Sequence, residues 1–360
     1  MLEKGVIPFV RFMELALYCP VYGYYEKEKD IIGRRGDFLT SVSVGDLFGE
    51  LLAFQFAEWL QPEVGSGTSE ARIVEAGAHD GQLANDVLTW LRDRRAELFR
   101  QIEYSIVEPS AQRRKWQEKT LAPFHGRIRW VTQLSDLNLN PKSPGVCGII
   151  FANELLDAMP VHRIGWDAAR KKWFEWGVGL DGEEFVPVKM RDLESRIRPP
   201  RLPDGLLEVL PDGFTTELCP AAEAWWGEAG GLLRRGRLMT IDYGLAEEDF
   251  FTPGRKEGTL RAYRGHQPVS NMLADPGAQD ITAHVNFSAI QAAGEAAGLR
   301  TEAFVRQANF LTQIAGRVWT HETDFVAWTA ARTRQFQTLT HPEHLGRPFR
   351  VLIQSRSVGG

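Results

Sequence analysis

The chain has 360 residues, of which 43% are hydrophobic and 25% charged, an ordinary composition for a folded protein of one enlarged domain or two domains. Lysine and arginine number 42 against 47 acidic residues, and the net charge of -5 argues against broad binding to nucleic acid or anionic membranes. Cys19, Cys147 and Cys219 lie too far apart to suggest a disulfide framework or a zinc knot, which indicates a reducing compartment.

Residues 1–62 predict a helical extension that ends in a lid. Apolar residues recur at helical spacing from Phe9 to Ala16, and the helix should end at Cys19 because the proline after it disfavours helical backbone. The apolar run before Arg11 is too short for a signal core or a membrane span, and the chain has no recognisable transit peptide. We therefore expect a cytoplasmic protein.

A polar stretch ahead of the second predicted helix, Leu47 to Leu60, is the expected lid. Asp37 and Thr40 lie on this stretch, and loop residues next to a ligand site commonly contact the ligand. The same stretch is also compatible with an ordinary helix entry capped by Ser43 or Asp46.

The stretch from Arg72 to Leu88 predicts a strand, a tight turn and a helix. Glycines at Gly77 and Gly81 allow the backbone to bend sharply and a ligand to approach it, and the N-terminus of the helix favours a polar ligand there. A carboxylate at Glu75 would repel the pyrophosphate of a dinucleotide, whereas it suits the cationic amino-acid end of S-adenosylmethionine. Taken alone, the pattern also fits an ordinary strand-to-helix turn.

Further strands are predicted at residues 103–108, 127–131 and 146–151, with a helix at 111–120 between the first two. Glu108 closes the first of these strands, where an acid in a doubly wound sheet binds ribose hydroxyls. The alternative is a capping acid in front of Pro109.

The strand 146–151 leads into Asn153, Glu154 and Asp157. The carboxyl ends of parallel strands face the ligand crevice, so these side chains should meet the substrate beside the cofactor. Two carboxylates three positions apart suit the planar donor fork of a guanidinium. The other interpretation makes Asn153 a helix cap and leaves Asp157 in solvent.

After Val161 the composition changes, and tryptophans around the Asp181-Gly182 turn predict a small antiparallel unit within an inserted lobe, residues 161–235. A helix from Glu217 to Leu233 should return the chain to a fifth strand at 237–244. A helix at 288–297, a strand at 300–305, a C-terminal helix and a strand at 349–355 complete seven strands.

No metal site is predicted, because His266 and His284 have no third ligand spaced with them. The chain contains no Gly-x-Ser-x-Gly elbow and no His-Glu-x-x-His pair, which disfavours a hydrolase.

Ordered blocks from about Gly36 to Phe287 resemble the MidA-like methyltransferases, a family of bacterial and mitochondrial proteins. The blocks are Gly36-Asp37-Phe38-x-Thr40-Ser41, Phe48-Gly49-Glu50, Glu75-x-Gly77-x-x-x-Gly81-x-Leu83-Ala84-x-Asp86, Asn153-Glu154-x-x-Asp157-Ala158-x-Pro160-Val161, Ile241-Asp242-Tyr243-Gly244, Gly258-Thr259-Leu260 and Asp280-Ile281-Thr282-Ala283-His284-Val285.

This resemblance implies an α/β class I methyltransferase: a Rossmann-like seven-stranded sheet with helices on both faces, formed by residues 63–160 and 236–360. It implies S-adenosyl-L-methionine as cofactor and an arginine of a partner protein as acceptor. The mitochondrial member is an assembly factor that methylates a subunit of respiratory complex I, so a eukaryotic chain would belong in the mitochondrial matrix. Two positions depart from the family pattern: Val42-Ser43 replaces a proline and an acid, and His79 replaces the middle glycine of the cofactor turn.

The expected cofactor-binding residues are Asp37, Thr40, Glu75, Gly77, Gly81, Glu108 and Asn153. The expected catalytic residues are Glu154, Asn153, Asp157 and His284, with Glu154 orienting or deprotonating the guanidinium. Two other functions stay open, a non-catalytic assembly protein on the same fold and a methyltransferase acting on a small molecule.

Overall fold

The computed structural model describes residues 5–27, 40–64, 71–138, 145–190, 193, 197–265, 267–318, 325 and 328–357. The chain divides into two compact units. Unit 1 comprises Met1–Asp30, Leu156–Ala224 and Gly244–Ile290, and unit 2 comprises Ile31–Leu155, Trp225–Tyr243 and Gln291–Gly360. The first helix and residues 244–290 therefore group with the greater part of the predicted inserted lobe.

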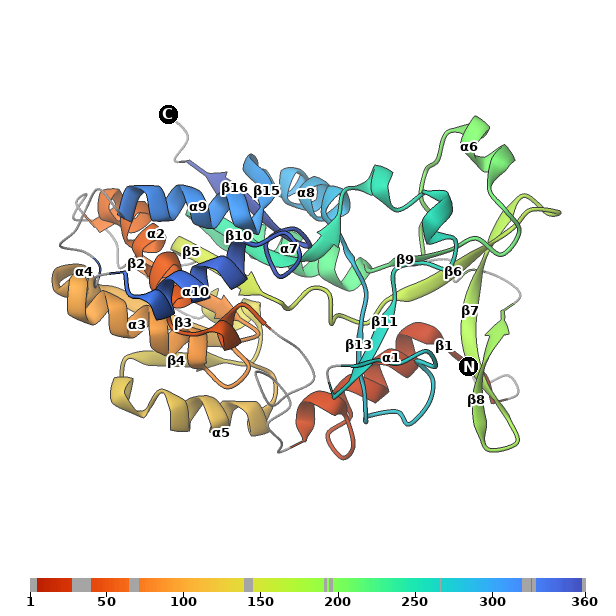
Figure 1. Cartoon of the computed structure of the whole chain (residues 1–360), viewed down its shortest axis with the longest axis horizontal. Coiled ribbons are helices and arrows are strands. Elements are labelled where there is room, and N and C mark those ends of the chain that lie inside the picture. Colours follow the sequence, from red (N-terminus) through yellow and green to blue (C-terminus); the bar gives the residue numbers. More distant parts are fainter. Residues whose placement is uncertain are drawn as a thin grey trace. The chain divides into compact units, whose positions relative to one another are not determined.

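The central sheet contains the seven predicted strands in the order β15-β16-β10-β5-β2-β3-β4 (Figure 1). All neighbouring pairs are parallel except those of β16, which is antiparallel to β10 and β15. A short additional strand pairs with β10. The strands are β2 (Ala71–Ala76), β3 (Ile102–Val107), β4 (Ile128–Val131), β5 (Val146–Asn153), β10 (Leu233–Leu245), β14 (Val285–Asn286), β15 (Arg300–Arg306) and β16 (Phe349–Arg356). The predicted Rossmann-like sheet is confirmed.

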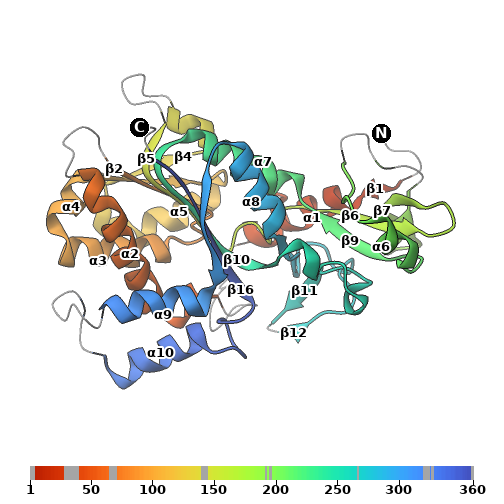
Figure 2. The same cartoon turned by 90° about the horizontal axis from the view of Figure 1, so that it is seen from above.

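Both faces of the sheet are covered by helices, which explains why the inner strands are apolar along their length. Val351 and Ile353 on β16 belong to a core cluster shared with α2 and α9. Gln354, the next residue along β16, points to the opposite face of the sheet, where its side chain accepts a hydrogen bond from Trp226 of α7. Figure 2 shows the helices on the two sides of the sheet. The helices of this sheet are α2 (Leu47–Val64), α3 (Gln82–Arg94), α4 (Ala96–Gln101), α5 (Ala111–Thr120), α7 (Pro220–Leu232), α8 (Phe287–Ala296), α9 (Gln307–Val318) and α10 (Ala330–Thr340).

Unit 1 carries the predicted antiparallel unit as a sheet ordered β1-β7-β6-β9, with β8 paired to β7. A second, three-stranded sheet ordered β12-β11-β13 was not anticipated. The elements are α1 (Phe9–Tyr18), β1 (Ile7–Pro8), β6 (His162–Asp167), β7 (Lys172–Asp181), β8 (Glu184–Lys189), α6 (Asp204–Val209), β9 (Thr215–Leu218), β11 (Arg261–Arg264), β12 (Gln267–Pro268) and β13 (Asp280–Thr282). No described helix has the length and apolar character needed to cross a membrane.

Two predicted helices differ from the structure. The helix expected from Glu217 begins only at Pro220, because proline disfavours helical backbone in the residue before it, and residues 215–218 form β9 instead. The single C-terminal helix is a pair, α9 and α10. Short 3-10 turns complete the chain at Tyr24–Glu26, Val42–Val44, Ala122–Phe124, Leu134–Asn138, Glu247–Asp249 and Pro253–Arg255.

Three backbones meet closely at Gly148 of β5. Gly148 pairs with Arg72 of β2 on one side and with Gly236 of β10 on the other. A Cβ added to Gly148 would lie 2.1 Å from the carbonyl oxygen of Arg72, and its φ of +138° is rare for any residue with a side chain. Glycine is therefore required for the strands to reach this spacing.

We expect Gly148→Ala to lower the free energy of unfolding by roughly 3 kcal/mol or more, since rigid backbone would have to move. The control is Gly316→Ala on α9, where nothing lies within 4 Å of the added methyl group. That change should raise stability by up to about 1 kcal/mol through helix propensity. Urea unfolding followed by circular dichroism measures both, and equal midpoints for the Gly148 variant and the wild type would contradict the prediction.

Candidate active site

The carboxyl ends of four parallel strands meet at one edge of the sheet. Ala76, at the end of β2, pairs with Val107 of β3 and with Ala152 of β5. Asn153, at the end of β5, pairs with Ile241 of β10. The glycine turn, Glu108, Asn153 and Glu154 therefore all follow from the same edge, where ligands bind in open α/β sheets.

The glycine turn is shaped by protein packing as well as by space for a ligand. Gly77 and Gly81 have φ values of +74° and +86°, in the left-handed region that favours glycine. A Cβ on Gly77 would lie 2.8 Å from Leu155, and one on Gly81 would lie 3.3 Å from the Cα of Gln117. The sequence argument gave the sharp bend and the approach of a ligand as reasons for these glycines, and the structure adds close contacts with two neighbouring segments of chain.

His79 stands between them with a φ of 46°, which explains why the family places glycine there. Its side chain is about one-third exposed and lies near Trp116, with ring centroids 6.2 Å apart, and near Asp80. Its carbonyl oxygen accepts a hydrogen bond from Gln117. The turn therefore places a histidine in a left-handed position that favours glycine.

Glu75 is buried beneath the turn, where Tyr104 of β3 donates a hydrogen bond of 2.6 Å to its carboxylate. Burial raises the pKa of Glu75 to about 7, the charges of Asp80 and Asp86 add to the rise, and the Tyr104 hydrogen bond opposes it. Sequence reasoning missed Tyr104. Its position was available only from the strand register, which pairs Tyr104 with Ile73.

Glu108 is almost fully buried, and its carboxylate is held by three donors. Its Oε1 accepts from the amide of Ser110 at 2.8 Å and from Arg113 at 3.0 Å. Its Oε2 accepts from Gln117 at 2.9 Å. Glu108 thus binds groups at the entry to α5, whose N-cap residue is Ser110, and its ribose role stays a prediction.

Asn153 and Glu154 form a second turn at the end of β5. Glu154 has a φ of 53°, a conformation that costs energy for a residue with a side chain and that is concentrated at functional sites. Its amide donates to the carbonyl oxygen of Ile241, and the next amide, Leu155, donates to the buried carboxylate of Asp242. Asp242 belongs to the block Ile241-Asp242-Tyr243-Gly244, and the hydrogen bond to its carboxylate gives that block a structural role as a support for this turn.

The Glu154 carboxylate is oriented by its neighbours. Its Oε1 accepts from the amide of Ser41 at 2.9 Å and from the side chain of Asn153 at 3.2 Å. The other polar atom of that asparagine, Oδ1, is buried and has no hydrogen-bond partner among the described residues. An unsatisfied buried acceptor at this edge fits a bound group that donates hydrogen bonds, such as the ammonium of S-adenosylmethionine.

Of the predicted lid residues, Thr40 is described and Asp37 lies outside the described residues. Thr40 and Ser43 exchange hydrogen bonds in a local turn, so the Ser43 hydroxyl binds Thr40 and does not cap α2. The amide that opens α2, Leu47, donates instead to the side chain of Gln335.

Asp157 and His284 belong to unit 1, whereas Asn153 and Glu154 belong to unit 2. The backbone of Asp157 accepts a hydrogen bond from Ala283, beside His284. Burial lowers the pKa of His284 to about 3, and the charges of Arg261 and Arg255 contribute, so its imidazole is neutral at ordinary pH. His266 lies outside the described residues, and the described part holds no cluster of three or more metal-ligating side chains.

The block Gly258-Thr259-Leu260 has a structural explanation in unit 1. The buried Glu217 accepts hydrogen bonds from the amide and the hydroxyl of Thr259, at 2.7 and 2.9 Å. A Cβ on Gly258 would collide with that carboxylate. These residues therefore hold one another in place.

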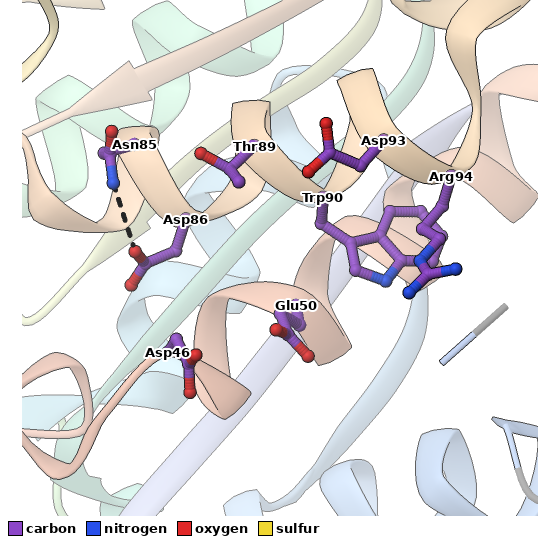
Figure 3. A pocket seen from close by; sticks show the side chains of 8 residues that line it. All are labelled: Asp46, Glu50, Asn85, Asp86, Thr89, Trp90, Asp93 and Arg94. Atoms are coloured by element: carbon purple, nitrogen blue, oxygen red, sulfur yellow. Dashed lines mark hydrogen bonds between the residues drawn. The ribbon is translucent and has the colours of Figure 1, made fainter. Parts of the chain in front are cut away.

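A cavity of about 200 Å³ lies between α2 and α3 (Figure 3), and none of the predicted site residues lines it. It is lined by Asp46, Glu50, Asn85, Asp86, Thr89, Trp90, Asp93 and Arg94. Glu50 is ion-paired with Arg332, and Asp86 packs 2.5 Å from where a Cβ on Gly49 would lie. Gly49 and Asp86, both in family blocks, thus serve the contact of the two helices.

Residues 51–305 match the family model described as S-adenosyl-L-methionine-dependent methyltransferases. The chain belongs to this family. It is an α/β enzyme that uses S-adenosylmethionine as methyl donor, and the resemblance to the MidA-like proteins is confirmed.

A similar solved structure is that of a candidate methyl transferase from Burkholderia thailandensis bound to S-adenosylhomocysteine. The two sequences are 32% identical, the match covers 99% of this chain and 89% of the Burkholderia chain, and the TM-score is 0.81. The chain is also 28% identical to the Drosophila melanogaster protein named protein arginine methyltransferase NDUFAF7 homolog, over 98% of this chain and 82% of the relative. The human protein arginine methyltransferase NDUFAF7 is 28% identical over 82% of this chain and 68% of its own length.

The raised pKa of Glu75 predicts a pH-dependent stability in the protein without ligand. The native state holds the Glu75 proton more tightly than the unfolded chain, so this contribution is fully present below about pH 4.5 and is lost as the pH rises through about 7. From about pH 4.5 to about pH 7 we expect the free energy of unfolding of the wild type to fall by roughly 3 kcal/mol relative to that of Glu75→Gln.

Urea unfolding over that pH range measures the difference between the two proteins. Tyr104→Phe is the matched variant, since removing the hydrogen bond to the carboxylate should move the loss to higher pH. Parallel stability profiles for the wild type and Glu75→Gln would disprove the assignment.

Proposed function

We propose that the chain methylates an arginine of a partner protein. The observation that carries the proposal is the Asn153-Glu154 turn, a strained turn at the ligand edge whose carboxylate is aimed by the Ser41 amide. Relatives named protein arginine methyltransferases, at 28% identity over most of the chain, support the choice of acceptor.

S-adenosylmethionine supplies a methyl group on a sulfonium, and the residues around it need chiefly to position the acceptor. An arginine nitrogen is a poor nucleophile while the guanidinium is protonated. Glu154 binds the guanidinium in the proposed mechanism, accepts a proton from it as the new bond forms, and is kept in orientation by Ser41 and Asn153. Asp157 and His284 stay proposed catalytic residues on the strength of the sequence motifs alone, and the imidazole of His284 is neutral at ordinary pH because burial lowers its pKa.

For the cofactor we propose contacts with the two glycines of the turn, with Glu75 and Asn153 on the amino-acid end and with Glu108 on the ribose. Thr40 and Asp37 complete the proposed site from the lid. Support comes from the unsatisfied Oδ1 of Asn153, an acceptor in a position to take a donor from an ammonium group.

The acceptor we propose is a subunit of a respiratory complex I-like enzyme, as the family resemblance implies. Methyl transfer to this subunit takes place, in this proposal, in the cytoplasm of a bacterium or in a mitochondrial matrix. A small-molecule acceptor is the competing proposal, and it predicts methyl transfer without any protein product.

Glu154→Gln keeps the size of the side chain and removes its charge. We expect methyl transfer to fall by roughly a hundredfold or more, the usual scale of a general base, with the affinity for S-adenosylhomocysteine nearly constant. Asp157→Asn should act in the same direction and more mildly. The control is Glu97→Gln, the same exchange at an exposed position of α4, which should leave transfer unchanged.

Transfer is measured as tritium from labelled cofactor in the protein fraction of an extract that lacks this enzyme, followed by hydrolysis and separation of methylarginines. Wild-type transfer by Glu154→Gln would remove Glu154 from the mechanism. Label confined to small molecules would favour the competing acceptor, and no label in either fraction would favour an assembly protein that only binds.

A further inference from the structure

Helix α5 buries one of its residues, and that residue is polar. Gln117 has no exposed surface, while the rest of α5 is half-buried or exposed. An amide buried in this way is costly unless its hydrogen bonds are made. The hydrogen bonds of Gln117 therefore indicate which parts of the protein α5 keeps in place.

The Gln117 amide joins three different segments. Its Nε2 donates to the carbonyl oxygen of His79 at 3.0 Å and to Oε2 of Glu108 at 2.9 Å. Its Oε1 accepts from the indole of Trp130 at 3.0 Å. A carbonyl and a carboxylate only accept and an indole only donates, so the amide has one allowed orientation.

We propose that Gln117 is a positioning residue of the cofactor site, which locks the glycine turn to Glu108. The inference rests on the proposed placement of the ribose at Glu108. One amide group holds both the turn that faces the ligand and the carboxylate that receives it, with Trp130 preventing the amide from rotating.

The same contacts limit what Glu108 offers to a ribose. A carboxylate has about four acceptor positions, two on each oxygen. The amide of Ser110 and the side chain of Arg113 occupy both positions of Oε1, and Gln117 occupies one of Oε2. Among the described residues one position stays open, so Glu108 accepts one ribose hydroxyl and not the pair.

The test uses S-adenosylhomocysteine and its 2′-deoxy and 3′-deoxy analogues, titrated calorimetrically into the full chain. For the wild type, one analogue should bind roughly tenfold or more weakly than the parent, as expected for a lost hydrogen bond to a charged group, and the other only slightly more weakly. Comparable losses of affinity for both analogues would show that Glu108 accepts both ribose hydroxyls and would overturn the limit of one hydroxyl.

Gln117→Met keeps the volume of the side chain and removes its hydrogen bonds. It should weaken binding of the parent compound roughly tenfold and reduce the discrimination between the two analogues, because Glu108 is then no longer fixed. A merely structural role would lower stability and leave that discrimination unchanged. Gln101→Met, the same exchange at the exposed end of α4, is the control and should change neither quantity.

Trp130→Phe provides a second variant should Gln117→Met fail to fold. It removes the indole donor alone, lets the Gln117 amide rotate, and should reduce the discrimination in part. Unchanged discrimination in the variants that fold would overturn the positioning role.

One further variant, Glu108→Gln, separates this inference from the proposed site. If the wild type binds S-adenosylhomocysteine and Glu108→Gln leaves the preference between the analogues intact, the ribose lies elsewhere and both ideas fail. If Glu108→Gln abolishes the preference while Gln117→Met preserves it, the proposed site stands and only the role of Gln117 is lost.

Discussion

The close contact between Gly77 and Leu155 is the constraint on which the rest of the site depends. It brings the turn after β2 against the turn after β5, where a Cβ on Gly77 would lie 2.8 Å from the end of the Leu155 side chain. The parallel register of these strands sets the contact, because Ala76 lies opposite Ala152. The turn proposed for the cofactor and the turn proposed for catalysis are therefore packed against each other.

Several carboxylates lie buried or half-buried around this contact, and each would destabilise the fold if it had no hydrogen-bond donor. Each has a specific donor from a different element: Tyr104 for Glu75, Gln117 for Glu108, the Ser41 amide for Glu154 and the Leu155 amide for Asp242. The donors come from strand β3, helix α5, the lid and the turn after β5. The electrostatic state of the site is consequently tied to the folding of the whole sheet unit.

Local patterns were sufficient for most of the sheet. Apolar runs closed by Glu75, Glu108 and Asn153 predicted β2, β3 and β5, because strands buried on both faces are apolar along their length. The three-stranded sheet β12-β11-β13 was missed, since its strands are two to four residues long and too short for a periodic pattern. The β9 strand was missed because helix-forming residues follow it directly.

The sequence by itself determined where the strands of the main sheet lie along the chain, the acid and glycines of the turn, and the family, because these depend on local composition and on ordered motifs. Only the tertiary structure decided which donors meet these acids. Tyr104 and Gln117 lie 29 and 9 positions from the acids to which they donate, and the Leu155 amide lies 87 positions from Asp242. Such pairings follow from strand register and helix packing, which bring distant residues together without leaving a periodic signal in the chain.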